Sequence, residues 1–276
     1  MYSKNDLLTD SLPPISDKTL SDLRLIVKSK PVSSPDVYSA FVDQAKHYFA
    51  SSKRNKLFGL DQFAFVDATI GCTHFIDNLI QKYSLSGLQI FEHDYKYYQR
   101  LDPGIKFATV GKLDPQRPVL IAAPFPGYLD LHIQWKQILD ECLEKDIDIH
   151  IDGCWMGAAT NIELDLGHPA IKSIGFSLSK SLGMHWNRIG LRFSKINDPH
   201  DSITIQNKFS MIPECLMHNA IVAMDQVEID YLWNTYEAKH IDICKQLYLR
   251  PSKIIYAAHS MDRRKLYGLK KLIEQG

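Results

Sequence analysis

The sequence contains few cysteines and no paired-cysteine motif. Its 276 residues include five cysteines, and none of them form a C-x-x-C pair. The sequence therefore gives no support for a zinc ribbon or a dithiol redox motif. The odd number of cysteines and their wide spacing, in a chain of this length, argue against a disulfide framework. We expect reduced thiols, as in a cytoplasmic protein.

The sequence also lacks an excess of charge of either sign. It has 32 Lys and Arg residues against 32 Asp and Glu residues, so the formal net charge is zero. No overall basic field is present to attract nucleic acid or an anionic membrane. There is no apolar run of about 18 residues and no secretory signal near the N-terminus. We therefore expect no nucleic-acid partner, no membrane partner and a cytoplasmic location.

The length corresponds to roughly two domains and allows a large buried core. Residues 1–56 are predicted to form a helical N-terminal region. One helix begins after the cap Ser16-Asp17, and a second begins at Ser34-Pro35-Asp36. Residues 57–212 are predicted to form an α/β large domain. Residues 213–276 are predicted to form a helical C-terminal region with a reduced small domain.

Short apolar segments alternate with helical patterns in the large domain. The predicted strands are 63–68, 88–91, 107–110, 119–123, 147–151, 171–178 and 189–193. Helical patterns follow Gly71 and cover residues 131–143. This alternation predicts an α/β fold, three layers deep, with a mostly parallel central sheet. Beyond it we expect a long helix at 227–247, a short strand at 254–258 and a basic terminal helix.

Asp152 stands at the carboxyl end of the predicted strand 147–151, immediately before Gly153. Ligands of open α/β sheets bind beyond the carboxyl ends of the strands, so this position suits a site residue. An aspartate before glycine also fits a turn-capping role. A metal site built from Asp148, His150 and Asp152 lacks a further ligand set, so we expect no metal.

Lys180 follows another apolar strand, in the sequence S-L-S-K-S-L-G over 177–183. A lysine at the end of a buried strand is partly desolvated, which lowers the pKa of its amine and makes it a usable nucleophile. The alternative is an exposed strand end from which the lysine reaches solvent.

Two further features suit an anion. Arg188 lies eight residues after Lys180, and arginine binds phosphate in a planar, bidentate manner. Gly71-Cys72-Thr73 stands at a predicted helix start, where free backbone N–H groups favour negative charge. Each feature is weak alone, because glycine before a helix is common.

Taken together, these segments resemble the fold-type-I pyridoxal-phosphate enzymes, in particular class I/II aminotransferases, in a compact form. The resemblance covers about residues 67–195. It rests on H-I-D-G-C-W over 150–155, S-L-S-K-S-L-G over 177–183 and R-I-G-L-R-F over 188–193. The spacing from Asp152 to Lys180 and on to Arg188 is the specific part of the pattern.

The resemblance implies a role for each matching residue. Lys180 is similar to the lysine that binds the aldehyde of pyridoxal 5'-phosphate as a Schiff base, and Asp152 to the carboxylate that keeps the pyridine nitrogen protonated. The expected phosphate ligands are Ser177, Arg188, Gly71, Cys72 and Thr73. Tyr95 occupies the place of the aromatic residue that stacks on the cofactor ring, although a core or surface role also fits it.

The sequence departs from the family pattern at several positions. Trp155 replaces a tyrosine that bonds the ring hydroxyl, and an indole N–H can donate but cannot ionise. Phe125 replaces the asparagine of an N-P-x-G loop. The resemblance also implies a second-domain arginine that binds the substrate carboxylate. Arg250, Arg263 and Arg264 are candidates by position only.

The first functional hypothesis is an aminotransferase that exchanges amino groups between small-molecule donors and acceptors. A decarboxylase or lyase on the same site is the alternative, because these reactions begin from the same covalent adduct. A protein that binds the cofactor without turnover is the third hypothesis. The resemblance also implies a homodimer, since such sites generally lie at a subunit interface.

Overall fold

The computed structural model describes residues 2–9, 12–29, 36–101 and 104–275. The predicted N-terminal residues Ser34 and Pro35 of the second helix lie outside these ranges. A seven-stranded sheet forms the centre of the molecule, with strand order β2-β9-β8-β6-β5-β3-β4. Its strands are β2 (Phe65–Thr69), β3 (Gln89–Ile90), β4 (Lys106–Phe107), β5 (Val119–Ala122), β6 (Ile149–Asp152), β8 (Ile171–Ser177) and β9 (Gly190–Ser194).

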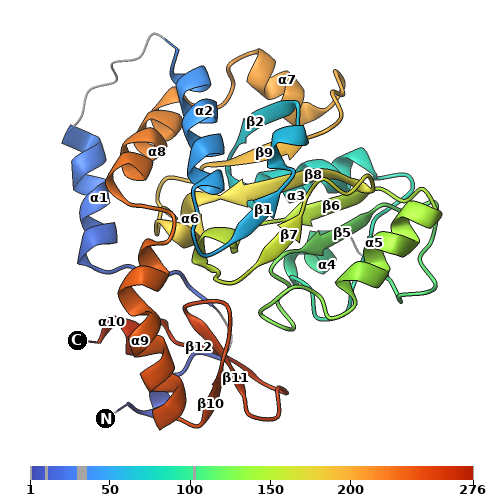
Figure 1. Cartoon of the computed structure of the whole chain (residues 1–276). Coiled ribbons are helices and arrows are strands. Elements are labelled where there is room, and N and C mark those ends of the chain that lie inside the picture. Colours follow the sequence, from blue (N-terminus) through green and yellow to red (C-terminus); the bar gives the residue numbers. More distant parts are fainter. Residues whose placement is uncertain (1, 10–11, 30–35, 102–103, 276) are drawn as a thin grey trace.

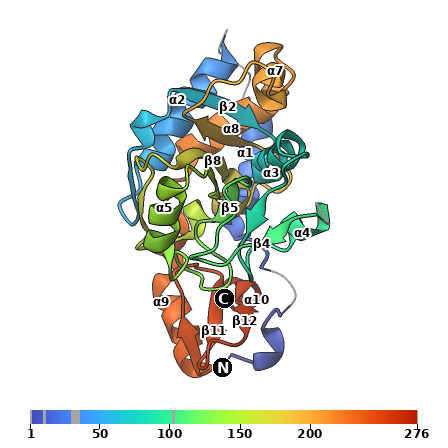
Figure 2. The same ribbon diagram turned by 90° about the vertical axis from the view of Figure 1, so that its right-hand side faces the viewer.

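Helices cover both faces of this sheet, which confirms the predicted three-layer α/β fold. Figure 2 shows α3 (Gly71–Lys82) and α4 (Tyr97–Leu101) on one side, with α2 (Val37–Ala50) and α5 (Trp135–Glu144) on the other. Alternation along β5 explains this, because successive side chains of a strand point to opposite faces. Leu120 packs in a cluster with Phe75 of α3, whereas Ile121 joins the cluster that contains Ile138 of α5.

The sheet is mostly parallel, as predicted, with one exception. Strands β3, β4, β5, β6 and β8 pair in parallel. Strand β9 runs antiparallel to both β8 and β2. The carboxyl ends of β5, β6 and β8 therefore meet at one edge, and the chain turns at that edge from β8 through α6 (Leu178–Ser181) before it returns as β9.

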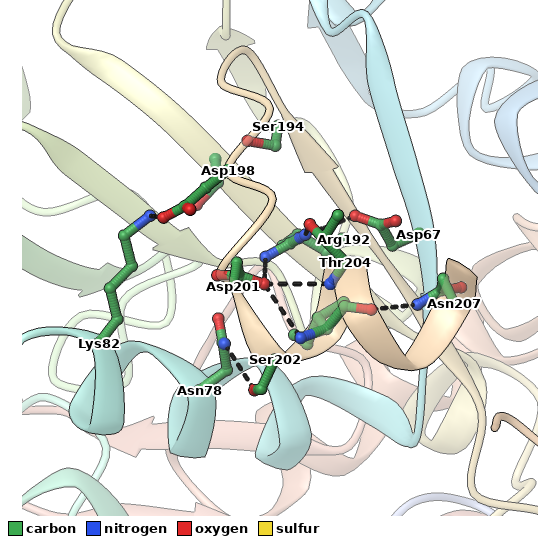
Figure 3. Close-up of polar contacts among 12 residues, drawn as sticks. Asp67, Asn78, Lys82, Arg192, Ser194, Asp198, Asp201, Ser202, Thr204 and Asn207 are labelled. Atoms are coloured by element: carbon green, nitrogen blue, oxygen red, sulfur yellow. Dashed lines mark hydrogen bonds and ion pairs between the residues drawn. The ribbon is translucent and has the colours of Figure 1, made fainter. Parts of the chain in front are cut away.

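A buried ion network fixes β9 between β2 and α7 (Ser202–Lys208). Figure 3 shows Arg192 of β9 between two carboxylates. Its guanidinium lies 2.5 Å from Asp67 of β2 and 2.5 Å from Asp201, the N-cap of α7, and it also donates to Thr204 at 2.8 Å. Because all three charged groups are largely buried, the network ties the edge of the sheet to its covering helix.

The remaining elements cover one end of the sheet and form a C-terminal unit beneath it (Figure 1). Helix α8 (Glu214–Gln226) packs against α2 and α1 (Lys18–Ser29). Helix α9 (Tyr231–Gln246) packs on a small sheet of β10 (Leu249–Pro251), β11 (Ala257–Ser260) and β12 (Leu266–Gly268), followed by α10 (Lys270–Glu274). In the N-terminal segment, after the 3-10 turn Lys4–Asp6, Leu8 bridges Gly268 of β12.

Several predicted boundaries were wrong. The long helix expected over 227–247 begins at Tyr231, because Val227 is the extended C-cap of α8. The strand expected over 254–258 begins at Ala257. Ile254 and the two residues after it form a turn, and their apolar character reflects complete burial. The helix expected from residue 131 begins at Trp135, and the strand expected at 107–110 is Lys106–Phe107.

The polar segment 51–56 ends in a short strand. Strand β1 (Lys56–Phe58) pairs in parallel with β7 (Glu163–Asp165). The 3-10 turn Leu60–Gln62 follows β1, and the 3-10 turn Met156–Ala158 lies between β6 and β7. Both strands have three residues and are mostly exposed, so they carry no apolar periodicity. Among the described residues, no helix combines the length and apolarity needed to cross a membrane.

Candidate active site

The start of α3 and Arg188, two residues before β9, form a corner suited to an anion. Gly71 has φ +74°, a left-handed conformation that favours glycine. A Cβ atom placed on Gly71 would lie 3.4 Å from Ser177 Oγ and 3.5 Å from Arg188 Nη2. Arg188 also donates a hydrogen bond to the Thr73 hydroxyl. The residue before the helix makes no side-chain cap, so the first-turn N–H groups add to these donors.

A second glycine, Gly190, allows β8, β9 and the start of α3 to approach one another closely. A Cβ atom on Gly190, the first residue of β9, would lie 2.1 Å from the carbonyl oxygen of Phe176 and 3.1 Å from Gly71 Cα. Only a residue without a side chain fits between β8 and the start of α3. The backbone therefore brings Ser177, Arg188 and the N-terminus of α3 to one point.

Asp152 ends β6 and is buried, with 4% of its surface exposed. The Tyr98 hydroxyl donates to Asp152 Oδ2 at 2.9 Å, and the Cys154 backbone N–H donates to Oδ1 at 3.0 Å. Burial raises the pKa of Asp152, while these hydrogen bonds oppose the rise. A carboxylate accepts up to about four hydrogen bonds, so Asp152 retains capacity for a further donor.

Two thiols flank this carboxylate. The donor atoms of Cys72, Asp152 and Cys154 all lie within 4.8 Å of one another. Burial, with further contributions from Cys154 and Asp152, raises the pKa of Cys72 well above its usual value, so its thiol stays protonated. The sequence predicted no metal site and treated the cysteines as separate thiols. The only local signals were a cysteine in the first turn of a helix and another two residues after a strand-end aspartate.

Lys180 lies in the single turn α6, directly after β8. Burial lowers the pKa of its amine; Cys154 and Asp152 oppose this shift, and Arg188 adds to it. The Nζ atom donates to the carbonyl oxygen of Leu12 at 3.1 Å, so the N-terminal segment passes beside it. The charges of Asp152 and Arg188 therefore both act on the Lys180 amine.

The two aromatic candidates differ in placement. Tyr95 packs edge-on against Tyr98 with ring centroids 5.6 Å apart, and it is 44% exposed. Because Tyr98 donates to Asp152, this ring contact places the partly exposed Tyr95 one side chain away from that carboxylate. The indole of Trp155 instead packs edge-on against Tyr256, with centroids 6.4 Å apart. In the described ranges, no hydrogen bond joins the Trp155 side chain to the other candidate residues.

Sequence reasoning missed Tyr98 as the partner of Asp152. The structure also places the three arginines that were candidates for binding the substrate carboxylate. Arg250 and Arg263 line a cavity separate from the candidate site, and Arg264 is exposed beside Asp262. None of the candidate cofactor residues lines that cavity.

Comparison with solved structures shows that the chain has an aminotransferase-like fold, shared with several pyridoxal-phosphate-dependent enzymes. One solved structure with this fold is an aspartate aminotransferase double mutant of Thermus thermophilus, with TM-score 0.63 and 12% identity over 91% of this chain and 74% of that chain. The alanine aminotransferase of Pyrococcus furiosus gives TM-score 0.59 and 14% identity over 91% and 73%.

The same fold occurs in an enzyme of different activity. The L-threonine-O-3-phosphate decarboxylase of Porphyromonas gingivalis gives TM-score 0.57 and 14% identity over 90% of this chain and 82% of that chain. No protein-family model matches the sequence, and a comparison with curated proteins finds no significant match. At these identities the likeness establishes the fold, which confirms the predicted resemblance at that level.

The residues present fit pyridoxal phosphate by the chemistry of their donors. The corner at Gly71 supplies a guanidinium, hydroxyls and free N–H groups for a phosphate, and Asp152 supplies a buried carboxylate for a protonated ring nitrogen. Lys180 supplies a partly desolvated amine for an aldehyde. Within the described part of the chain, the Ser179 hydroxyl next to Lys180 in the sequence is buried and has no hydrogen-bond partner.

Proposed function

We propose that this chain is a pyridoxal-phosphate-dependent aminotransferase acting on an amino acid or a related amine, with Lys180 as its covalent attachment residue. The observation that carries the proposal is the convergence of three chemically distinct groups at one sheet edge. These groups are the Lys180 amine after β8, the Asp152 carboxylate after β6 and the Arg188 corner at the start of α3.

Each group has a defined task in binding the cofactor. Arg188, Ser177 and Thr73 would hold the phosphate, together with the N–H groups of the first turn of α3. Asp152 would accept a hydrogen bond from the protonated ring nitrogen, and Tyr98 holds this carboxylate in place. When bound, the cofactor supplies an electron sink for negative charge at the substrate α-carbon.

Lys180 has the second task of moving a proton. With the cofactor and substrate bound, the free amine of Lys180 would take a proton from the α-carbon of the substrate and later return it. The neutral amine performs this step, and burial lowers the pKa of Lys180 in the required direction. The positive charge of Arg188 also lowers the pKa of Lys180.

A decarboxylase or lyase is the second candidate function. It is supported by the fold, since the phosphothreonine decarboxylase and a PLP-bound C–S lyase of Staphylococcus hominis have TM-scores of 0.57 and 0.59. These values are close to those of the aminotransferases, so backbone similarity does not separate the reactions.

Spectroscopy of the reconstituted protein tests the proposal. The purified chain is incubated with pyridoxal phosphate and titrated with individual amino acids. We expect a visible cofactor band that converts to the band of pyridoxamine phosphate with at least one of them. Release of carbon dioxide or ammonia without this conversion would support the second candidate. Lys180→Ala should abolish the conversion, whereas Lys172→Ala, a change at the opposite end of β8, should not.

The family resemblance also supports a homodimer in the cytoplasm, as part of the same proposal. Light scattering during gel filtration of the reconstituted protein measures its mass directly. A mass of one chain at micromolar concentration would contradict the dimer.

A further inference from the structure

A cavity of about 450 Å³ lies away from the candidate active site, where the C-terminal unit meets the large domain. Residues of α9 and the small sheet form one side, and the segment that follows β5 forms the other. The elements of the C-terminal side lie together at the lower end of the molecule (Figure 1). No residue assigned to the cofactor lines this cavity, so it requires its own explanation.

The charged groups of the cavity leave a positive surplus. Two acidic residues line it, but each already has a cationic partner: Asp130 lies 2.8 Å from Lys253, and Glu237 lies 2.9 Å from Arg54. The guanidinium groups of Arg250 and Arg263 also line it. Within the described ranges, neither guanidinium makes an ion pair or a hydrogen bond.

The charges of both arginines act on the same residue, His259. Arg250 of β10 stands opposite His259 of β11 in the antiparallel register. Burial lowers the pKa of His259, its hydrogen bond to Tyr128 opposes this shift, and the charges of Arg263 and Arg250 lower the pKa further. The register places Arg250 beside His259 in the small sheet, and the positive charges of both arginines act on this histidine.

The buried wall of the cavity also contains polar atoms without partners. His259 donates from Nε2 to the carbonyl oxygen of Tyr128 at 3.1 Å, which leaves Nδ1 as an acceptor. This Nδ1 atom and the Thr160 hydroxyl are buried and have no hydrogen-bond partner among the described residues. Both side chains line the cavity and are less than a tenth exposed. Buried polar groups are normally paired, so these atoms indicate polar molecules in the cavity.

We propose that this cavity binds a small organic anion, whose carboxylate or phosphate group contacts Arg250 and Arg263. Guanidinium groups pair with both kinds of anion through two parallel hydrogen bonds. Trp233 and Leu129 line the same cavity and provide apolar contacts for the carbon skeleton. The proposal does not depend on the cofactor, because the two sites share no residue.

Calorimetric titration of the full chain with inorganic phosphate and, separately, with malate tests this site. We expect at least one probe to bind at millimolar concentration, and the preferred probe identifies the anion class. The double substitution Arg250→Gln/Arg263→Gln should weaken that binding roughly tenfold or more, since it removes charge-assisted hydrogen bonds. Both residues are exposed at their ends, so the variant should fold, which circular dichroism checks.

Two matched variants separate this site from other anion sites. Arg264→Gln removes an adjacent exposed arginine outside the cavity and should leave binding unchanged. Arg188→Gln removes the cation of the cofactor corner, so binding that persists in this variant belongs to the cavity. Equal affinity in the wild type and in Arg250→Gln/Arg263→Gln would overturn the proposal, as would the absence of binding by both probes.

Discussion

The Tyr98 hydroxyl donates a hydrogen bond to Asp152 Oδ2 across 2.9 Å, and both side chains are buried. Tyr98 comes from α4, on the face of the sheet that α3 covers, whereas Asp152 ends a central strand. Burial alone raises the pKa of Asp152 and so favours its neutral form. The Tyr98 hydrogen bond favours the ionised form, which makes Tyr98 a positioning residue for this carboxylate.

Replacing Tyr98 by phenylalanine keeps the ring and removes the donor. We expect the pKa of Asp152 to rise, so that Asp152 becomes protonated at a higher pH than in the wild type. Loss of one hydrogen bond to a charged group corresponds to about 1.5–3 kcal/mol, or roughly tenfold or more in cofactor affinity. The pH dependence of the cofactor spectrum measures the shift. Tyr97→Phe is the control, because the Tyr97 hydroxyl donates to the exposed Asp77 instead. Equal pH profiles of the cofactor spectrum in the two variants would argue against the role of Tyr98.

Substitution of Arg188 should weaken cofactor binding through the phosphate. Arg188→Gln removes a charged donor next to Ser177 and Thr73, and we expect a loss of affinity of roughly tenfold or more. Arg188→Lys should recover part of the affinity, because it restores the charge without the planar fork. Fluorescence titration with pyridoxal phosphate compares these variants with Arg264→Gln. An unchanged dissociation constant in Arg188→Gln would exclude the proposed phosphate corner.

Asp94 should make stability depend on pH. It is buried and accepts N–H groups from Tyr95 at 2.7 Å and Ala122 at 3.2 Å. Burial, with a smaller contribution from Asp152, raises its pKa to about 8. The folded protein therefore holds a proton that the unfolded chain releases near pH 4. The contribution of Asp94 to stability is complete below about pH 4 and is lost as the pH rises to about 8.

Denaturant unfolding at several pH values checks this linkage. Relative to Asp94→Asn, which cannot titrate, wild-type stability should fall by up to about 1.4 kcal/mol per pH unit between pH 4 and 8. Above pH 8 the difference should be constant. Parallel stability curves for the two proteins across this range would show that Asp94 is ionised in the fold.

Arg192→Ala should destabilise the fold strongly. The substitution leaves Asp67 and Asp201 buried without their cation, and such losses are about 3–5 kcal/mol. Lys136→Ala removes a cation from the exposed pair with Asp140 at 2.6 Å, where we expect a loss below about 1 kcal/mol. Urea unfolding of both variants measures the contrast. Similar losses for the two would mean that the Arg192 network contributes no more than a surface pair.

The sequence predicted those parts of the site that are local in the chain. Asp152 and Ser177 end apolar strands, and the spacing to Lys180 and Arg188 is read along a single segment. The parallel sheet followed from the alternation of strands and helices. The antiparallel direction of β9 did not, because strand direction depends on the path that the chain takes after α6.

Features formed by segments that lie far apart in the sequence could not be predicted from local sequence patterns. The contact of Tyr98 with Asp152 and the grouping of Cys72 with Cys154 exist only after the strands pair. The short strands β1 and β7 are mostly exposed, so no apolar pattern indicated them. Trp155 occupies the predicted position in the chain, but packing against Tyr256 directs its ring to the C-terminal unit.

Borohydride reduction of the reconstituted protein, followed by peptide mass spectrometry, tests the assignment of Lys180 most directly. Reduction makes the link between an amine and the cofactor aldehyde permanent. We predict a single pyridoxyl-phosphate adduct, on the peptide that contains Lys180, and no such adduct in folded Lys180→Ala. An adduct on a different lysine, or an equal yield of adduct in Lys180→Ala, would contradict the assignment.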